Sequence, residues 1–181
     1  MASYRFPHAR RLHQAIEQRA GAEVAAQITG DDPGPTPGDA RKAEWAEAAC
    51  LRLIDRFSPE EVAAIRIDCA CGPAEGRMKA LKRHYQSHGT LASIAEKFSA
   101  EGGPSWVENG VLYVSYPACY CSCVKRAPGP LPRAWCLCSV GYTRRNLEYA
   151  LGRPVKVTLL ESVKTGGARC LMKAEVVGDD V

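Results

Sequence analysis

The sequence predicts an α+β fold, in which a helical N-terminal half packs on an antiparallel sheet with one C-terminal helix. Two observations support this class. Apolar residues recur every three or four positions through most of the first hundred residues, as they do in amphipathic helices. After Gly102 the pattern changes to short runs rich in Val, Tyr and Trp, and Asn109-Gly110 separates two of these runs as a hairpin turn.

The first half of the chain predicts a series of capped helices. They are expected over residues 7–29, 39–57, 59–65, 74–87 and 90–98. Gly30 is suited to end the first helix. Ser58-Pro59-Glu60-Glu61 is a capping box with proline at the first helical position, and it starts the third helix.

The second half predicts a sheet with one helix. Strands are expected over residues 106–107, 111–116, 154–161 and 169–177, and a helix over residues 139–151. Thr165-Gly166-Gly167 joins the last two strands as a turn.

A segment rich in turn residues separates the first helix from the rest of the chain. Residues 31–38 hold three prolines and two glycines, which is typical of a linker or an exposed loop. We therefore divide the chain into an N-terminal helix (1–30), a Pro/Gly linker (31–38) and a single cysteine-rich α+β domain (39–177). A short acidic tail over 178–181 is expected to fray.

The overall composition is that of a globular protein that can fold without disulfides. The chain has 181 residues, of which 46% are apolar, and its formal net charge of +4 is low for a dedicated nucleic-acid binder. No run approaches the roughly 18–20 apolar residues of a membrane span. Residues 1–30 lack the apolar stretch of a secretory signal. We therefore expect a cytoplasmic protein with no membrane partner.

Cysteine is the unusual part of this composition, with nine residues in the chain. In a reducing compartment, clustered cysteines are more often metal ligands or reactive groups than disulfides. Eight candidate metal ligands follow from the clustering: Cys69, Cys71, Cys119, Cys121, Cys123, Cys136, Cys138 and Cys170. If residues 119–123 are extended, their three sulfurs point to the same side. A metal draws such thiolates together without the strain of a disulfide between close neighbours.

The Cys-x-Cys spacing leaves both the metal and the use of the thiols open. Such pairs occur in zinc, copper(I) and iron–sulfur sites alike. We expect zinc, with an iron–sulfur cluster as the alternative. The thiols could instead be buried core residues, or a redox or nucleophilic site. Cys50 is interpreted as a buried small hydrophobe, and His84 with His88 as part of a solvated helix face.

From Trp135 onward, the chain resembles a known family. An aromatic residue before Cys136, the pair Gly141-Tyr142 at a helix start, and the stretches LGRPVKV (151–157) and ESVKTGGARC (161–170) carry the resemblance. They are similar to the C-terminal end of the 4-vinyl-reductase domain, whose relatives include L-2-amino-thiazoline-4-carboxylic acid hydrolase-like proteins. The resemblance covers the C-terminal part only.

The resemblance implies a buried pocket for a small apolar ligand, a zinc ion beside it, and often a homodimer. Cys170 matches the last zinc ligand of the family, and Cys136 or Cys138 matches the ligand before the helix. Ser162 stands where the family often has a further cysteine. That ligand would then come from Cys69, Cys71, Cys119, Cys121 or Cys123.

The function expected from these observations is metal binding and small-molecule binding by a domain that resembles vinyl-reductase-like sensory domains. The alternative is an enzyme, either a hydrolase of a small acid with a thiol nucleophile or a redox protein with an iron–sulfur centre. A basic helical face around Arg77, Lys82 and Arg83 would suit nucleic acid. Without interleaved exposed aromatic residues it is interpreted as solvated surface, and no nucleic-acid partner is expected.

Overall fold

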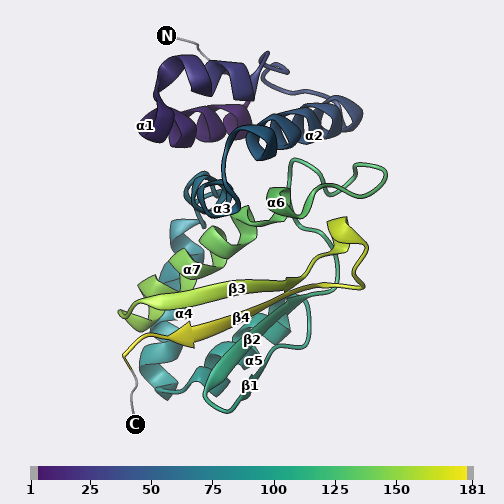
Figure 1. The fold of residues 1–181 in the computed structure, drawn as a ribbon. Coiled ribbons are helices and arrows are strands. Elements are labelled where there is room, and N and C mark those ends of the chain that lie inside the picture. Colours follow the sequence, from purple (N-terminus) through teal and green to yellow (C-terminus); the bar gives the residue numbers. More distant parts are fainter. Residues whose placement is uncertain (1–3, 179–181) are drawn as a thin grey trace.

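A computed structural model describes residues 4–178 and places helices before and beside a four-stranded sheet (Figure 1). The helices are α1 (Pro7–Thr29), α2 (Asp39–Arg56), α3 (Pro59–Asp68), α4 (Glu75–His88), α5 (Leu91–Glu101), α6 (Arg133–Cys136) and α7 (Cys138–Leu151). The strands are β1 (Trp106–Glu108), β2 (Val111–Tyr116), β3 (Val155–Glu161) and β4 (Cys170–Val176), with a 3-10 turn, η1 (Val163–Thr165), before β4. The predicted α+β class is confirmed. Of the predicted acidic tail, residues 179–181 lie outside the described part of the chain.

The sheet is antiparallel throughout, in the order β1-β2-β4-β3. β1 and β2 form the predicted hairpin, in which Asn109 and Gly110 both have positive φ (49° and 76°). Helices α5 and α7 pack on one face of the sheet, and α4 packs on these two helices (Figure 1). Every second side chain of a strand faces the helices, and this row buries Leu112, Val114, Leu159, Met172 and Ala174.

α1 differs from its prediction, because it is not one continuous helix. Gly21 has φ 85° and ψ 165°, and the chain changes direction there (Figure 1). Only a residue without a Cβ adopts this conformation at low cost. Alanines on both sides continue the apolar pattern through Gly21, so the periodicity alone predicted an uninterrupted helix.

Two predicted helix ends are confirmed by their hydrogen bonds. The Glu61 N–H donates to Ser58 Oγ (3.3 Å) and the Ser58 N–H donates to a Glu61 carboxylate oxygen (2.9 Å), which completes the capping box. Gly30 ends α1 by donating its N–H to Ala26 O. α3 continues beyond its predicted end at residue 65 to Asp68, so that Cys69 is its C-cap residue.

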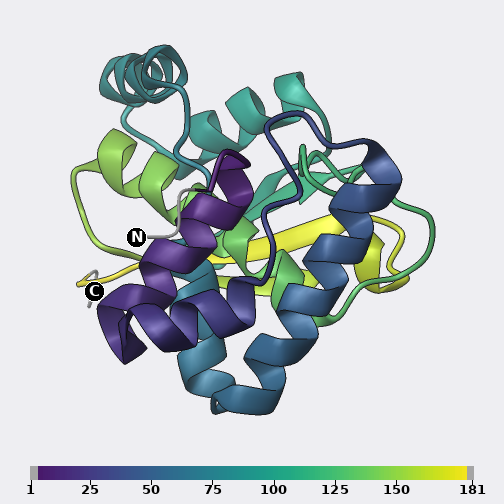
Figure 2. The same cartoon turned by 90° about the horizontal axis from the view of Figure 1, so that it is seen from above.

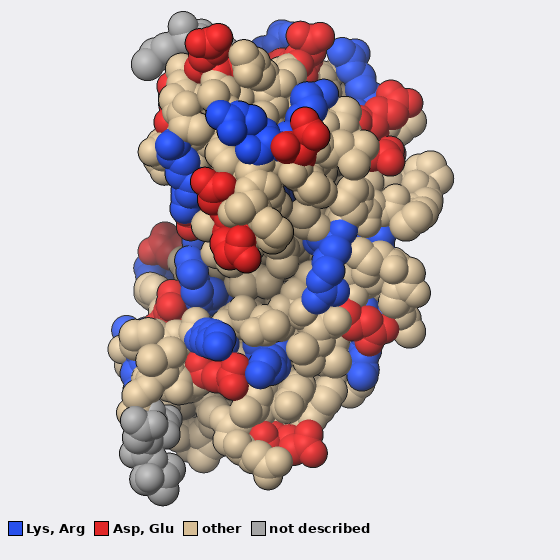
Figure 3. Space-filling model, viewed as in Figure 1, with Lys and Arg blue, Asp and Glu red and all other residues tan. Residues whose placement is uncertain are grey.

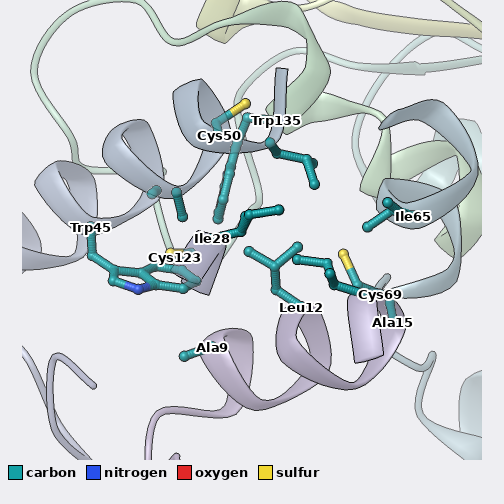
Figure 4. Packing of buried hydrophobic residues seen from close by; sticks show 14 of the residues in the cluster. Ala9, Leu12, Ala15, Ile28, Trp45, Cys50, Ile65, Cys69, Cys123 and Trp135 are labelled. Carbon is teal, nitrogen blue, oxygen red and sulfur yellow. The ribbon is translucent and has the colours of Figure 1, made fainter. Parts of the chain in front are cut away.

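A hydrophobic core joins the N-terminal helices to α6. Helices α1 and α2 pack against α3 and α6 rather than on the strands (Figures 1 and 2). Figure 4 shows Leu12, Trp45, Cys50 and Ile65 gathered around Trp135. The rings of Trp45 and Trp135 meet edge to face, with centroids 5.7 Å apart. Cys50 is buried in this core, as predicted.

The surface carries charges of both signs. Acidic and basic side chains alternate over the face shown in Figure 3. On α4, Arg77 pairs with Glu101 and Lys79 pairs with Glu75, so part of the basic charge of this helix is neutralised locally. No helix within residues 4–178 is long and apolar enough to cross a membrane.

Helix α7 approaches α3 most closely at Gly141. A Cβ at this position would lie 2.1 Å from the backbone oxygen of Ile67 and 2.9 Å from the Cβ of Ala70. The absence of a side chain therefore lets the first turns of α7 lie against the end of α3. This contact brings Cys138, at the start of α7, toward the segment that follows α3.

We predict that Gly141→Ala destabilises the fold, because the new methyl group would overlap a backbone oxygen that cannot swing aside. Overpacking of this kind costs about 1–3 kcal/mol and sometimes more. The matched control is Gly76→Ala on exposed α4, where a Cβ meets no atom within 4 Å. Urea unfolding should show the loss in Gly141→Ala alone. Equal stability of the two variants would contradict the close approach.

Candidate functional site

Six of the nine cysteines line one cavity of about 370 Å³. They come from four separate segments of the chain: Cys71, Cys119 with Cys121, Cys136 with Cys138, and Cys170. All nine cysteines are free thiols in the structure. The fold thus brings together most of the cysteines that the sequence proposes as ligands.

Most of these cysteines are positioned by the end of a regular element. Cys136 ends α6 and Cys138 begins α7. Cys170 begins β4 and pairs directly with Tyr116, the last residue of β2. Cys71 follows the C-cap of α3 by two residues. The cavity therefore lies where the helix-facing side of the sheet meets the ends of α3 and α6.

Residues 119–123 do not form the extended segment that would place their three sulfurs on one side. The backbone folds into turns there, because the N–H groups of Val124 and Lys125 both donate to Cys121 O (3.1 and 2.8 Å). Cys119 and Cys121 line the cavity, but Cys123 is 2% exposed and belongs to the hydrophobic core. The three sulfurs therefore do not form a row on one side of an extended chain.

Cys69 and Cys123 are the two candidate ligands that do not line the cavity. Both are buried in the core formed by α1, α2, α3 and α6. Burial raises the pKa of Cys69, and it raises the pKa of Cys123 to about 12. Cys69 lies close to the cavity all the same, because it precedes Cys71 by two residues.

Two cavity thiols from distant segments are hydrogen-bonded to each other. This bond between Cys121 and Cys138 lowers the pKa of Cys121 and raises the pKa of Cys138. Cys121 is therefore the more acidic thiol of the pair. Burial, by contrast, raises the pKa of Cys119, and it raises the pKa of Cys136 to about 11.

Arg66 is a buried cation beside these thiols, and no sequence pattern singled it out. It lies on α3 and is 3% exposed. Its guanidinium lies 4.0 Å from the centre of the Trp135 ring and donates to Cys69 Sγ (3.1 Å) and to Trp135 O (2.8 Å). Burial lowers the pKa of Arg66, but nearby Cys69 and Cys138 raise it, and the pKa lies above its ordinary value.

A second arginine holds Cys71 from another helix. Arg11, on α1, donates from Nη2 to Cys71 Sγ (3.0 Å) and to His8 Nδ1 (3.1 Å). Because arginine only donates, His8 Nδ1 must accept, and its proton is on Nε2. That Nε2 lies 3.1 Å from Ser122 Oγ and donates to it. His8 therefore cannot act as a base toward Ser122 in this arrangement.

Ser162 touches the cysteine cluster directly. Its side chain is fully buried and its Oγ donates to Cys136 Sγ at 3.0 Å. The same Oγ accepts the backbone N–H of Lys164. Besides the Cys121–Cys138 pair, three sulfurs accept hydrogen bonds from other side chains, those of Cys71 and Cys136 in the cavity and that of Cys69 in the core.

Aromatic side chains line much of the rest of the cavity. They are Tyr116, Tyr120, Trp135 and Tyr142, with Thr143 beside them. Burial raises the pKa of Tyr116 to about 12, so its phenol is neutral at physiological pH. Tyr120 is 57% exposed and packs edge to face on Tyr116 (5.7 Å).

The thiols surround the cavity rather than converging on one point. Within residues 4–178, no three His, Cys, Asp or Glu side chains are grouped so that they could hold a metal ion. The chemistry of the donor set nevertheless suits a metal, since thiolates are the ligands that zinc and iron–sulfur clusters prefer.

His84 and His88 lie on α4, where His84 Nε2 contacts Ser93 O (3.0 Å).

Comparison with protein families places this chain in one of them. The profile of a family of unknown function, DUF6144, matches residues 2–179, so the chain belongs to the DUF6144 family. A comparison with curated proteins gives no match. Membership of this family assigns no activity, so the function is inferred from the chemistry of the cavity.

We predict a pH dependence of stability that comes from His8. Burial, together with Arg11, lowers the pKa of His8 to about 4. Between about pH 6.5, the ordinary histidine pKa, and pH 4, the unfolded chain binds a proton that the folded chain does not, so stability falls as the pH falls. In metal-free, reduced protein, His8→Gln should flatten the urea-unfolding stability profile in this window.

The profile above pH 7 serves as the internal control for this experiment. The histidine is neutral there in both the folded and the unfolded chain, so the two proteins should differ by a constant offset. Parallel profiles down to pH 4 would show that His8 titrates normally in the folded state.

Proposed function

We propose that this protein binds a metal ion through cysteine thiolates of the cavity, with zinc as the expected ion, and receives a small molecule in the same cavity. The observation that carries the proposal is the convergence of six cysteines from four segments on one cavity. Segments this far apart in sequence do not bring unpaired thiols together without a packing or chemical reason. Cys50, by contrast, is buried in the hydrophobic core and does not line the cavity.

Hydrogen-bond donors around the sulfurs would stabilise the thiolates of a metal-bound state. A thiol sulfur is a weak acceptor, whereas a thiolate accepts strong hydrogen bonds. Arg66, Arg11 and Ser162 donate to three of the sulfurs. Donors of this kind fix the orientation of metal ligands and tune their basicity. When bound, a zinc ion in a closed thiolate site would supply folding free energy and no catalysis.

The position of Ser162 is consistent with the vinyl-reductase resemblance. Its Oγ lies 3.0 Å from Cys136 Sγ, so a cysteine at residue 162 would belong to the same cluster. Cys170, Cys136 and Cys138 all line the cavity, and the resemblance implies Cys170 and one of the other two as zinc ligands. The remaining ligands would then come from the other cavity cysteines, which include Cys119, Cys121 and Cys71.

We expect protein purified anaerobically to contain stoichiometric zinc and to absorb no visible light. Serine substitution at Cys121, Cys138 or Cys170 should lower the metal content and the thermal midpoint, because each removes a cavity thiolate. Cys50→Ala is the matched control and should leave the metal content unchanged, since Cys50 is buried in the core and does not line the cavity. Elemental analysis and thermal unfolding measure the two effects, and a free-thiol count shows which thiols the metal protects.

Other results of this measurement would point elsewhere. Iron with acid-labile sulfide and a brown colour would assign an iron–sulfur centre to the same thiols. Metal-free protein in which the cysteines of the cavity react freely would contradict the metal proposal.

The aromatic part of the cavity supports the second half of the proposal. Pockets for small molecules are lined mainly by apolar and aromatic side chains with a few polar groups. Here Tyr116, Tyr142 and Trp135 supply the apolar surface, and Thr143 and the phenol groups supply polar atoms. The volume of about 370 Å³ suits a small ligand.

We expect one equivalent of an apolar fluorescent dye to bind in this cavity with enhanced emission. Ala118→Trp should weaken dye binding, because exposed Ala118 lines the cavity and a larger side chain would occupy it. Ala100→Trp, on the exposed surface of α5, is the control. Equal binding by both variants would place the dye outside the cavity.

The hydrogen bond between Cys121 and Cys138 favours a second candidate function, a thiol redox activity. These thiols would lose two protons and two electrons to an external disulfide, which would leave as two thiols. Protein that is metal-free as isolated, and in which oxidised glutathione joins Cys121 to Cys138, would support this candidate in place of metal binding.

A further inference from the structure

The opening of the cavity lies between a loop and the end of a helix. Residues that line the cavity and are also exposed mark this opening, and they are Glu101, Ala118, Tyr120 and Ser122. Three of them belong to the loop that follows β2 (residues 117–127), and Glu101 is the last residue of α5. A molecule that enters the cavity from solvent therefore passes between this loop and the C-terminal end of α5.

The side chain of Tyr120 reaches across this opening. Tyr120 is 57% exposed, and its ring packs edge to face on Tyr116 with centroids 5.7 Å apart. Its hydroxyl lies against Gly102, the C-cap residue of α5, where an added Cβ would come within 3.2 Å of Tyr120 Oη. The side chain thus begins on the loop and ends at α5, and it narrows the opening between them.

The backbone on both sides of Tyr120 is held, whereas its side chain is not. Tyr116 ends β2 within the sheet, Cys121 O accepts two backbone N–H groups, and the Ser122 hydroxyl is hydrogen-bonded to His8 Nε2. The Tyr120 ring is held by its contact with Tyr116, and within residues 4–178 its hydroxyl makes no hydrogen bond. Exposed side chains change rotamer rapidly. Widening the opening therefore requires the rotation of one side chain and no movement of the loop.

We propose that Tyr120 is a gate that determines which molecules enter the cavity. Small molecules pass beside its ring, and larger ones enter after the ring has left Tyr116. Edge-to-face aromatic pairs are favourable, so the contact with Tyr116 stabilises the closed position. This inference rests on the proposed binding of a small molecule in the cavity, and it makes Tyr120 the residue that limits ligand size and the rate of entry.

The first test uses the thiols of the cavity as reporters of entry. Full-length, reduced protein is labelled with N-ethylmaleimide or with a bulky fluorescein maleimide, and mass spectrometry gives the labelling rate at each cysteine. The two reagents react by the same chemistry, so a bound metal or a high thiol pKa slows both of them. The ratio of the bulky-reagent rate to the small-reagent rate therefore measures size selectivity.

Tyr120→Ala should raise this ratio at the cavity thiols by about 2–10-fold, the range in which an edge-to-face ring contact shifts an equilibrium between closed and open positions. Tyr120→Phe keeps the ring and should keep the wild-type ratio. The matched control is Tyr149→Ala, since Tyr149 is an exposed aromatic residue of α7 that does not line the cavity. An unchanged ratio at every cavity thiol of Tyr120→Ala would overturn the gate.

A larger side chain tests the same inference if Tyr120→Ala does not fold. Tyr120→Trp should lower the ratio of the two labelling rates below that of the wild type, because the indole fills more of the opening. A ratio equal to that of the wild type would then overturn the gate.

Dye-binding kinetics separate the gate from the proposed function. In stopped-flow measurements with an apolar fluorescent dye, Tyr120→Ala should raise the association and dissociation rate constants by similar factors, because a gate acts on entry and exit alike. A residue that only contacts the bound dye changes mainly the dissociation rate. Wild-type protein that binds no dye would defeat the proposed small-molecule binding itself. Dye binding with unchanged rate constants and labelling ratios in Tyr120→Ala would defeat only the gate.

Discussion

The buried guanidinium of Arg66 links the two halves of this molecule. It extends from α3, stacks on Trp135 of α6, and donates to Cys69 beside the cysteine-lined cavity. The same tryptophan packs edge to face on Trp45 of α2, so the N-terminal helical core and the thiol site share one side chain. A charge at this point restricts what the neighbourhood can hold, because a low-dielectric interior strongly favours an anion next to it.

The cavity combines two kinds of surface that seldom occur together. Six thiols line it together with three tyrosines and a tryptophan. Metal binding through these thiols would rigidify loop 117–127, α6 and the start of β4, which all contribute cysteines. The shape of the aromatic lining depends on the same segments, since Tyr116 pairs with Cys170 across the sheet. Under the proposed function, metal and small-molecule binding would therefore be coupled through shared backbone.

Much of the secondary structure was predictable, because local signals decide it. The capping box at Ser58 and the turn at Asn109-Gly110 each depend on residues within a few positions of one another. The failures are also local in origin. Gly21 breaks α1 within an alanine-rich stretch whose periodicity continues through it, and the chain turns after Cys121, whose backbone O accepts two N–H groups. Alternating cysteines resemble a strand pattern, but hydrogen bonding rather than side-chain spacing decides whether a strand forms.

The sequence by itself determined the fold class, the order of helices and strands, and the candidate group of eight cysteines. Only the tertiary structure decided that six of them line one cavity while Cys69 and Cys123 belong to the core. It alone brought His8 and Arg11 of α1 to Ser122 and Cys71, which lie far along the chain. The physical reason is that such contacts depend on how helices pack against distant segments. Packing of this kind produces no periodic pattern in the sequence. The sequence does not show whether an arginine is buried or exposed. Its contacts are known only from the folded structure.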